Sequence, residues 1–276
     1  MPYRVVEARS LAPAITQLLV AAPLAARKAR AGQFVIVRVA EHGERIPLTI
    51  VDAAGGALRL VVQAVGKTTK QICGLRAGES LQDVAGPLGN PTHVEKLGTV
   101  VCVGGGVGAA EIYPIARALR AAGNDVRAVL GARSRDLVIL ERELQSCASE
   151  LVVTTDDGSY GRRGLVTGPL DEWLRSPGAV AAVFAAGPLP MMKAVAEATR
   201  PYGVRTWTSL NPLMVDGTGM CGGCRVTVEG ATRFACVDGP DFDAHLVDFD
   251  ELMRRNRAYA DLERLADQGS PGGLRP

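Results

Sequence analysis

The chain has 276 residues, 47% of them hydrophobic, and a formal net charge of +2 at pH 7. This length allows two or three domains, each with a core of its own. Acidic and basic residues are interspersed, which excludes the basic surface of a nucleic-acid-binding protein, and no apolar run is long enough to span a membrane. Cys73, Cys102 and Cys147 are scattered among apolar neighbours, a pattern that favours reduced thiols and a cytoplasmic location over a disulfide framework.

Residues 1–97 have the pattern of antiparallel β-structure. Short runs rich in β-branched residues cover residues 34–39, 48–51 and 57–65, and glycines separate them. Evenly spaced short strands and turns are typical of a small barrel. We therefore predict an antiparallel barrel here, with a helical turn at residues 68–73.

The first candidate motif of this part is Arg45-Ile-Pro-Leu-Thr-Ile. Such a strand can seat a flavin, because the arginine neutralises a pyrophosphate and the threonine offers a polar group near flavin N5. The candidate residues are Arg45, Pro47, Leu48, Thr49 and Ile50. An ordinary strand with a surface arginine explains the same run equally well.

A second candidate phosphate contact lies at the start of the predicted helical turn. The amide groups of a helix N-terminus favour anions. The candidate residues are Gly66, Lys67, Thr68 and Thr69. A solvated turn is the competing interpretation.

Residues 98–205 change to an alternation of strands and helices. Apolar strand runs cover residues 99–103, 126–131, 151–155 and 181–186, and a helix follows the first of them as far as Leu119. Short apolar strands that alternate with helices predict a doubly wound parallel sheet.

A glycine-rich loop joins the first of these strands to its helix. The loop reads Gly104-Gly-Gly-Val-Gly-Ala, the spacing of a dinucleotide-binding turn, and the candidate residues are Gly104, Gly106, Val107 and Gly108. A tight strand-to-helix turn would need similar glycines. After the second strand an NAD site usually has an acidic residue, but Arg133 stands there, which fits either the extra phosphate of NADP or a solvated strand end.

Residues 206–250 carry the most specific pattern of the chain. Plant-type [2Fe–2S] proteins use C-x₄-C-x₂-C and a distant fourth cysteine. An aspartate occupies the first position here, so the predicted ligands are Asp216, Cys221, Cys224 and Cys236. A zinc site and a redox dithiol are the alternatives, although zinc usually takes paired knuckles and no second knuckle is present in the sequence.

A hairpin and a charged tail complete the chain. Glu229-Gly230 predicts the turn of the hairpin. Residues 251–276 are predicted to form a helical tail that extends to Gln268 and has a disordered end from Gly269. Docking on a larger subunit and an amphipathic cap on this chain both explain the helix.

From residue 5 to residue 263, the order of these motifs resembles the ferredoxin–NADP⁺ reductase superfamily. The cluster region narrows the resemblance to the electron-transfer subunit of dihydroorotate dehydrogenase and its relatives. A third motif, Gly187-Pro-Leu-Pro-Met-Met-Lys, is similar to the motif that this family places near the nicotinamide. The resemblance therefore adds Gly187, Pro188 and Met191 to the candidate nicotinamide contacts.

Two positions depart from the dihydroorotate dehydrogenase pattern. Asp216 replaces a cluster cysteine, and Ala186 replaces the cysteine that many reductases carry before Gly-Pro. With residues 236–245 and 247–253, Asp216 makes the chain similar to a sister group. This group comprises the small subunits of NADH-dependent reduced ferredoxin:NADP⁺ oxidoreductases.

The resemblance implies an oxidoreductase subunit with FAD, NAD(H) and a [2Fe–2S] cluster. Hydride would pass from NADH to FAD and single electrons to the cluster, with no side chain acting as general acid or base. The relatives bind a larger FAD and [4Fe–4S] subunit that resembles the glutamate synthase small subunit, and the complex couples ferredoxin to nicotinamide nucleotides by electron bifurcation. The alternatives are an electron-transfer subunit of dihydroorotate dehydrogenase and a flavin-free, zinc-binding interaction protein.

Overall fold

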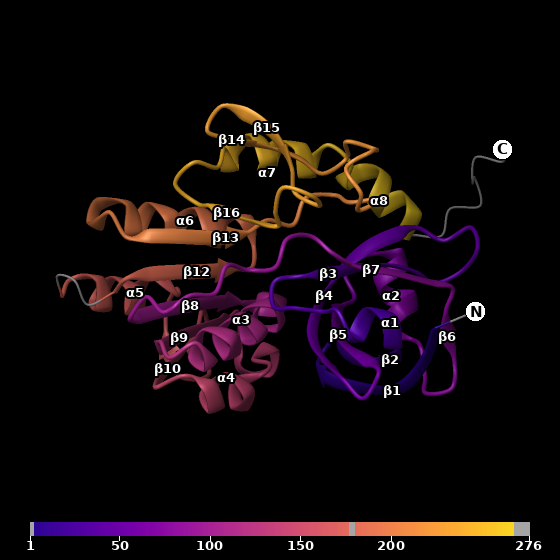
Figure 1. The fold of residues 1–276 in the computed structure, drawn as a ribbon, viewed down its shortest axis with the longest axis horizontal. Helices are drawn as coiled ribbons and strands as arrows, with labels where there is room; N and C mark the ends of the chain where they lie inside the picture. The colour runs from indigo at the N-terminus through magenta and orange to yellow at the C-terminus, as the bar shows by residue number, and fades with distance from the viewer. Residues whose placement is uncertain (1–2, 177–179, 268–276) are drawn as a thin grey trace.

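An antiparallel barrel forms the first part of the chain in the computed structural model, which describes residues 3–176 and 180–267 (Figure 1). The strand order is β6-β1-β2-β5-β4-β3-β7. Only Gln82 separates the two edge strands, and its backbone N–H donates to the carbonyl of Arg38 at 2.9 Å, so the sheet nearly closes. The elements are β1 (Tyr3–Ala12), β2 (Ile15–Ala21), α1 (Pro23–Ala26), β3 (Phe34–Arg38), β4 (Arg45–Ala54), β5 (Ala57–Gln63), α2 (Lys67–Cys73), β6 (Ser80–Leu81) and β7 (Asp83–Leu88).

A second seven-stranded sheet follows, in the order β11-β10-β9-β8-β12-β13-β16. All of its pairings are parallel except the one between β13 and β16. Its elements are β8 (Thr99–Gly105), α3 (Ala109–Ala121), β9 (Asp125–Ala132), α4 (Glu141–Cys147), β10 (Glu150–Thr155), β11 (Arg162–Arg163), α5 (Thr167–Leu174), β12 (Ala182–Ala186), α6 (Leu189–Thr199), β13 (Arg205–Ser209) and β16 (Asp241–Asp243), with single 3₁₀ turns at Gly106–Gly108, Arg135–Leu137 and Arg200–Tyr202.

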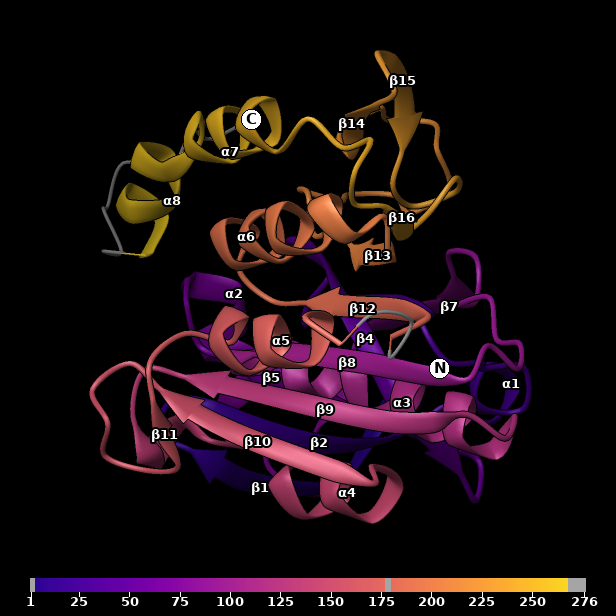
Figure 2. The same cartoon turned by 90° about the vertical axis from the view of Figure 1, so that its left-hand side faces the viewer.

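Helices cover both faces of this sheet, because its central strands are apolar on both sides (Figure 2). Cys102 in β8 packs with residues of α3 and α4 on one face, whereas Val101 and Val103 pack with residues of α5 and α6 on the other. The predicted barrel and doubly wound parallel sheet are therefore confirmed.

The last parallel strand and the added antiparallel strand were not predicted. β13 (Arg205–Ser209) pairs with β12 through residues 205–208, so the predicted boundary after residue 205 falls within a strand. β16 returns from the third part of the chain and pairs with β13. The cluster region is thus joined to the second sheet by hydrogen bonds as well as by the chain.

The third part contains a hairpin and two helices. The hairpin turns at Glu229 and Gly230, whose φ angles are +52° and +71°. The elements are β14 (Arg225–Val228), β15 (Ala231–Phe234), α7 (Phe249–Arg257) and α8 (Ala260–Asp267). The tail is thus two helices where one was predicted, and the end predicted to be disordered lies outside the described residues.

The tail returns to the barrel. The ammonium group of Lys70 in α2 lies 2.7 Å from the carboxylate of Asp267 in α8. Within residues 3–176 and 180–267, no helix combines the length and the apolar character that crossing a membrane would require.

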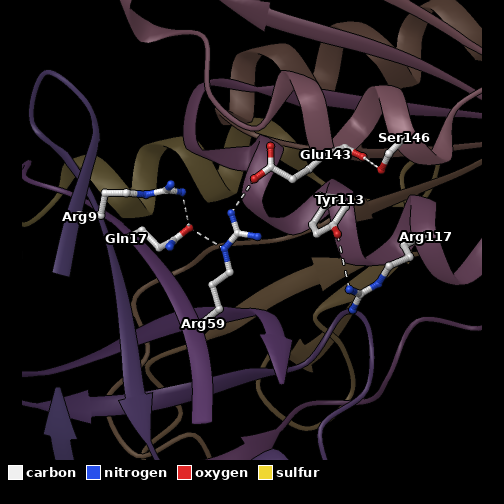
Figure 3. A network of polar contacts seen from close by, with 7 residues as sticks. All are labelled: Arg9, Gln17, Arg59, Tyr113, Arg117, Glu143 and Ser146. Atoms are coloured by element: carbon white, nitrogen blue, oxygen red, sulfur yellow. Dashed lines mark hydrogen bonds and ion pairs between the residues drawn. The ribbon is translucent and has the colours of Figure 1, made fainter. Parts of the chain in front are cut away.

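The barrel and the second sheet share one apolar cluster. Val51 and Val61 of the barrel belong to the same core as Ile112 of α3. A polar bridge borders this core (Figure 3): Arg59 of β5 donates to Gln17 at 2.6 Å and to Glu143 of α4 at 2.8 Å. The interface is therefore continuous and fixes how the two parts are oriented.

We expect a small but measurable coupling across this bridge. The Arg59 and Glu143 side chains are 16% and 30% exposed, so solvent screens their attraction only in part. A double-mutant cycle of Arg59→Ala and Glu143→Ala, followed by urea unfolding, should give a coupling free energy of about 0.5–1 kcal/mol. Strictly additive losses would show that the ion pair contributes nothing.

Candidate cofactor sites

The glycine loop lies at the switch point of the second sheet, where the chain continues from β8 to β9 on one side and β12 pairs with β8 on the other. Ligands of such sheets bind in the crevice at the carboxyl ends of these strands. Gly106 has a φ of +55° and open space where a side chain would stand. By contrast, a Cβ on Gly108 would lie 2.2 Å from the carbonyl oxygen of Ala186, at the end of β12.

The Gly187 motif packs directly on this loop. A Cβ on Gly105 would lie 2.3 Å from the Met191 sulfur and 3.2 Å from Pro188 Cδ. A Cβ on Gly187, whose φ is +153°, would lie 3.0 Å from the Gly105 carbonyl oxygen. Two motifs separated by about eighty residues of sequence therefore pack against each other at the strand ends where the crevice is expected, and Gly104 and Val107 belong to the first of them.

Arg133 lies beside this crevice and is exposed. It follows β9 two residues after Gly131, which pairs with Gly105. Its carbonyl accepts a hydrogen bond from the N–H of Asp157 at 3.2 Å. The backbone of Arg133 thus lies next to that of Asp157, where the adenosine end of a dinucleotide is expected.

The proposed flavin strand is β4, which has one side in the barrel core and the other side partly open to solvent. Leu48 and Ile50 are buried in the barrel core, so they serve the fold and offer a ligand only backbone groups. Arg45 is exposed, and Pro47 and Thr49 are half-buried on the opposite side. This side is the one available to a ligand.

The second phosphate motif lies close to the first. The Thr68 hydroxyl donates a hydrogen bond to Glu44, the residue before Arg45. The Thr69 hydroxyl accepts hydrogen bonds from the backbone N–H groups of Val65 and Gly66, both at 2.9 Å. Lys67 is exposed and Gly66 half-buried. Sequence reasoning missed Glu44, because a carboxylate next to an expected anion site gives no recognisable pattern.

The structure brings two of the four predicted cluster ligands, Cys224 and Cys236, into direct contact. The sulfur atoms of Cys224 and Cys236 are 3.2 Å apart, and both residues are buried. Cys221 is exposed. The Asp216 carboxylate accepts hydrogen bonds from the backbone N–H groups of Thr218 at 2.8 Å and Cys221 at 2.7 Å.

The charges of this loop fit a metal cluster. Burial, with the neighbouring Cys224, raises the pKa of Cys236 to about 12, so the Cys236 thiol needs a cation before it ionises. Hydrogen bonds from backbone N–H groups, that of Thr218 first, lower the pKa of Asp216. Its carboxylate is therefore available as an anionic metal ligand. Among the described residues, no three His, Cys, Asp or Glu side chains lie close enough together to hold a single metal ion. A [2Fe–2S] cluster does not require three, because each of its irons takes two protein ligands.

The cluster loop packs against the barrel. A Cβ on Gly217 would lie 2.6 Å from Leu88 Cδ1 and 2.9 Å from Ile36 Cγ1. Ile36 pairs with Pro47 of the flavin strand. The loop next to Asp216 is thus one strand away from the flavin motif, a proximity that no local pattern in the sequence could have indicated.

Comparisons with known proteins agree with this arrangement. Residues 211–248 match the model of the iron–sulfur cluster binding domain of dihydroorotate dehydrogenase B. A solved structure of an NADH-dependent reduced ferredoxin–NADP oxidoreductase, described for flavin-based electron bifurcation, has a TM-score of 0.92 and 44% identity, and the similarity covers 97% of both chains.

Two curated relatives extend the similarity along most of the chain. The dihydroorotate dehydrogenase B (NAD(+)) electron transfer subunit homolog of Thermotoga maritima is 48% identical over 88% of this chain and 86% of its own. The electron transfer subunit of Geobacillus thermodenitrificans is 34% identical over 87% of this chain and 95% of its own. The chain therefore belongs to the family of dihydroorotate dehydrogenase B electron transfer subunits and their homologues, and it is an electron-transferring oxidoreductase subunit.

Proposed function

We propose that this chain moves electrons between a nicotinamide nucleotide and a [2Fe–2S] cluster through FAD, as the small subunit of a bifurcating NADH-dependent ferredoxin–NADP⁺ oxidoreductase. FAD, when bound, accepts hydride and releases its electrons one at a time. The observation that carries the proposal is the packing of Gly217 on Ile36 and Leu88, because it brings the cluster loop to the flavin strand. The protein supplies placement and electrostatics.

Two segments of the barrel would hold the flavin. Arg45 would pair with its pyrophosphate, and Lys67 with the amide groups at the start of α2 would give a second phosphate contact. Thr49 would face the reactive ring. In this arrangement Glu44 would have to move away from the bound phosphates or bind a cation, because its carboxylate repels them.

The crevice at the switch point would hold NADH. The turn at Gly106–Gly108 offers backbone N–H groups to the pyrophosphate, and Gly106 leaves room for close approach. Met191 would lie beside the nicotinamide end and Arg133 beside the adenosine end. We assign NADH because the relative with 44% identity is named as an NADH-dependent enzyme.

Asp216 would set the cluster potential. A carboxylate is a harder and less covalent ligand than a thiolate, and ligand replacement is a main determinant of cluster potential. We expect Asp216→Cys to assemble a cluster whose midpoint potential differs from that of the wild type. Redox titration monitored by EPR tests this, and equal midpoints would show that Asp216 is not a ligand.

The partner would be a larger subunit with a second FAD and [4Fe–4S] clusters, resembling the glutamate synthase small subunit. Apolar side chains next to the cluster ligands support a contact at this face. Val215 is 45%, Met220 89% and Val237 41% exposed, each adjacent to a proposed ligand. Exposed apolar surface of this kind is typical of interaction sites. Ferredoxin would then react with the complex, which we place in the cytoplasm.

An anaerobic titration of the cofactor-loaded chain with NADH tests the proposal. We expect bleaching of a flavin absorbance band together with an S = ½ EPR signal from the reduced cluster. Reduction by NADPH alone would reverse the nucleotide assignment. A folded, metal-loaded protein without visible colour would exclude the flavin and iron–sulfur function.

A second candidate partner is a dihydroorotate dehydrogenase catalytic subunit. The 34% identity to an electron transfer subunit with this name favours it. Co-purification of the chain with each candidate subunit, followed by dihydroorotate-dependent and ferredoxin-dependent reduction of the flavin, distinguishes the two.

A further inference from the structure

A cluster of polar side chains lies where the three parts of the molecule meet, and the function proposed above does not use it: Thr92 and Ser209 are buried, and Glu111 and Asp241 are half-buried. Glu111 is the third residue of α3, three positions after Gly108. Ser209 ends β13 and pairs in register with Asp241, which begins β16. Thr92 belongs to the segment that links the barrel to the second sheet.

Hydrogen bonds join these four side chains into two pairs, which the β13–β16 register places side by side. The Ser209 hydroxyl donates to Glu111 Oε1 at 2.5 Å, and the Thr92 hydroxyl donates to Asp241 Oδ2 at 2.6 Å. The other oxygen of Asp241, Oδ1, is buried and has no hydrogen-bond partner. A buried carboxylate oxygen without a partner is costly, so this arrangement requires a proton or a counter-charge.

No counter-charge faces the pair. Among the residues that the structure describes, no lysine, arginine or histidine forms an ion pair with Glu111 or Asp241. Burial raises the pKa of Glu111 to about 7, the charge of Asp241 adds to this rise, and the bond from Ser209 opposes it. Burial likewise raises the pKa of Asp241, against the hydrogen bond from Thr92.

A proton on Glu111 would relieve the repulsion between the two carboxylates. Ser209 has a single hydroxyl proton, which it donates to Glu111, and Asp241 stands opposite Ser209 in the β13–β16 register. With the proton on Glu111, the pair carries one negative charge, on Asp241. When the pH rises and Glu111 loses its proton, a second negative charge without a cation appears, in the first turn of α3.

That charge would lie beside the glycine loop. Glu111 and the turn at Gly106–Gly108 are consecutive parts of one strand–loop–helix unit. The pyrophosphate of a nicotinamide dinucleotide is anionic, so an ionised Glu111 repels it, whereas a neutral Glu111 does not. We propose that Glu111 is a positioning residue for the dinucleotide. Its surroundings, Ser209 and the nearby Asp241, hold it neutral, and its ionisation weakens dinucleotide binding; this rests on the proposed nicotinamide site.

The sign of the effect follows from linkage. Glu111 loses its proton as the pH rises through about 7, so affinity should fall over the same range. Reciprocally, a dinucleotide that prefers the neutral form raises the pKa of Glu111, and binding takes up protons near and above pH 7. Proton uptake on binding is a property that a purely structural role would not produce.

Calorimetric titration of the oxidised, cofactor-loaded protein with NAD⁺ tests the proposal, because NAD⁺ binds there without reducing the flavin. We expect Kd to rise about 5- to 10-fold between about pH 6 and about pH 8.5. Measured near pH 7.5 in two buffers of different ionisation enthalpy, the binding heats should reveal proton uptake. Glu111→Gln should bind with the low-pH affinity at both pH values and take up no proton.

Two neighbouring variants give opposite shifts and so separate this role from a general loss of folding. Ser209→Ala removes the bond that lowers the pKa of Glu111, so the midpoint of the Kd profile should move to higher pH. Asp241→Asn removes the neighbouring negative charge, so the midpoint should move lower. Glu197→Gln, an exposed position of α6, is the matched control and should retain the wild-type profile.

The outcomes are distinguishable. A wild-type Kd that is independent of pH, without proton uptake, overturns the role of Glu111 but leaves the nicotinamide site in place. Equal pH profiles in the wild type and Glu111→Gln overturn it as well. Absence of NAD⁺ binding at every pH, in a protein that retains flavin and cluster, overturns the proposed nicotinamide site and this inference with it.

Discussion

Cys221→Ala should abolish the iron–sulfur cluster while leaving the fold and the flavin in place. Cys221 is exposed, so its removal costs little packing, unlike removal of the buried Cys224 or Cys236. A [2Fe–2S] cluster needs all four protein ligands, and alanine offers none. We therefore expect loss of the reduced-cluster EPR signal and of most bound iron, whereas NADH should still bleach the flavin.

Cys73→Ala is the matched control. Cys73 ends α2 in the barrel, is half-buried, and donates only a weak hydrogen bond to the Val62 carbonyl at 3.5 Å. Its variant should retain the cluster, with a loss of unfolding free energy of about 1 kcal/mol from the missing thiol. An undiminished EPR signal in Cys221→Ala would remove this residue from the ligand set and, with it, the proposed arrangement of ligands.

The sequence predicted the elements whose pattern is local. The runs that became β3, β5, β9, β10 and β12 are short, apolar and bounded by turn residues, and each lies where it was expected. The turn at Glu229 and Gly230 followed from its two-residue spacing, and both residues have the positive φ that such a turn requires. Each of these features depends on neighbours within a few residues.

Features that depend on distant segments were not predictable. β16 has three residues, Asp241–Asp243, and becomes a strand only because β13 is there to pair with it. The contact between Gly105 and Met191 joins two loops that the sequence separates widely. The sequence identified both loops. It did not indicate that the atoms of one loop leave room only for a glycine in the other.

The same distinction applies to the polar residues. Cysteine spacing identified the candidate cluster ligands, because that spacing is a local property of the loop. The sequence did not single out Glu111 as a candidate site residue, because a glutamate in the first turn of a helix is ordinary and favourable on an exposed surface. Its surroundings come from β13 and β16, and only their pairing places Ser209 and Asp241 at this helix.

Gly108→Ala should disrupt the nicotinamide crevice while sparing the other two cofactors. The backbone at Gly108 has a φ of −60°, which alanine adopts readily, so the effect comes from the added methyl group alone. That group would lie 2.2 Å from the Ala186 carbonyl oxygen and 2.7 Å from the Gly187 nitrogen. Both are backbone atoms, so relief requires the end of β12 to move away from β8, which widens the crevice.

We expect this variant to lose about 1–3 kcal/mol of unfolding free energy and to bind NAD⁺ at least about tenfold more weakly. Flavin content and the cluster signal should be unchanged, since β4 and the cluster loop do not contact this methyl group. Gly168→Ala is the matched control, because nothing lies within 4 Å of its Cβ position and it stands within α5. That variant should be neutral or slightly more stable. Wild-type NAD⁺ affinity in Gly108→Ala would mean that the dinucleotide does not use the junction of β8 and β12, and the site would have to be sought elsewhere on the sheet.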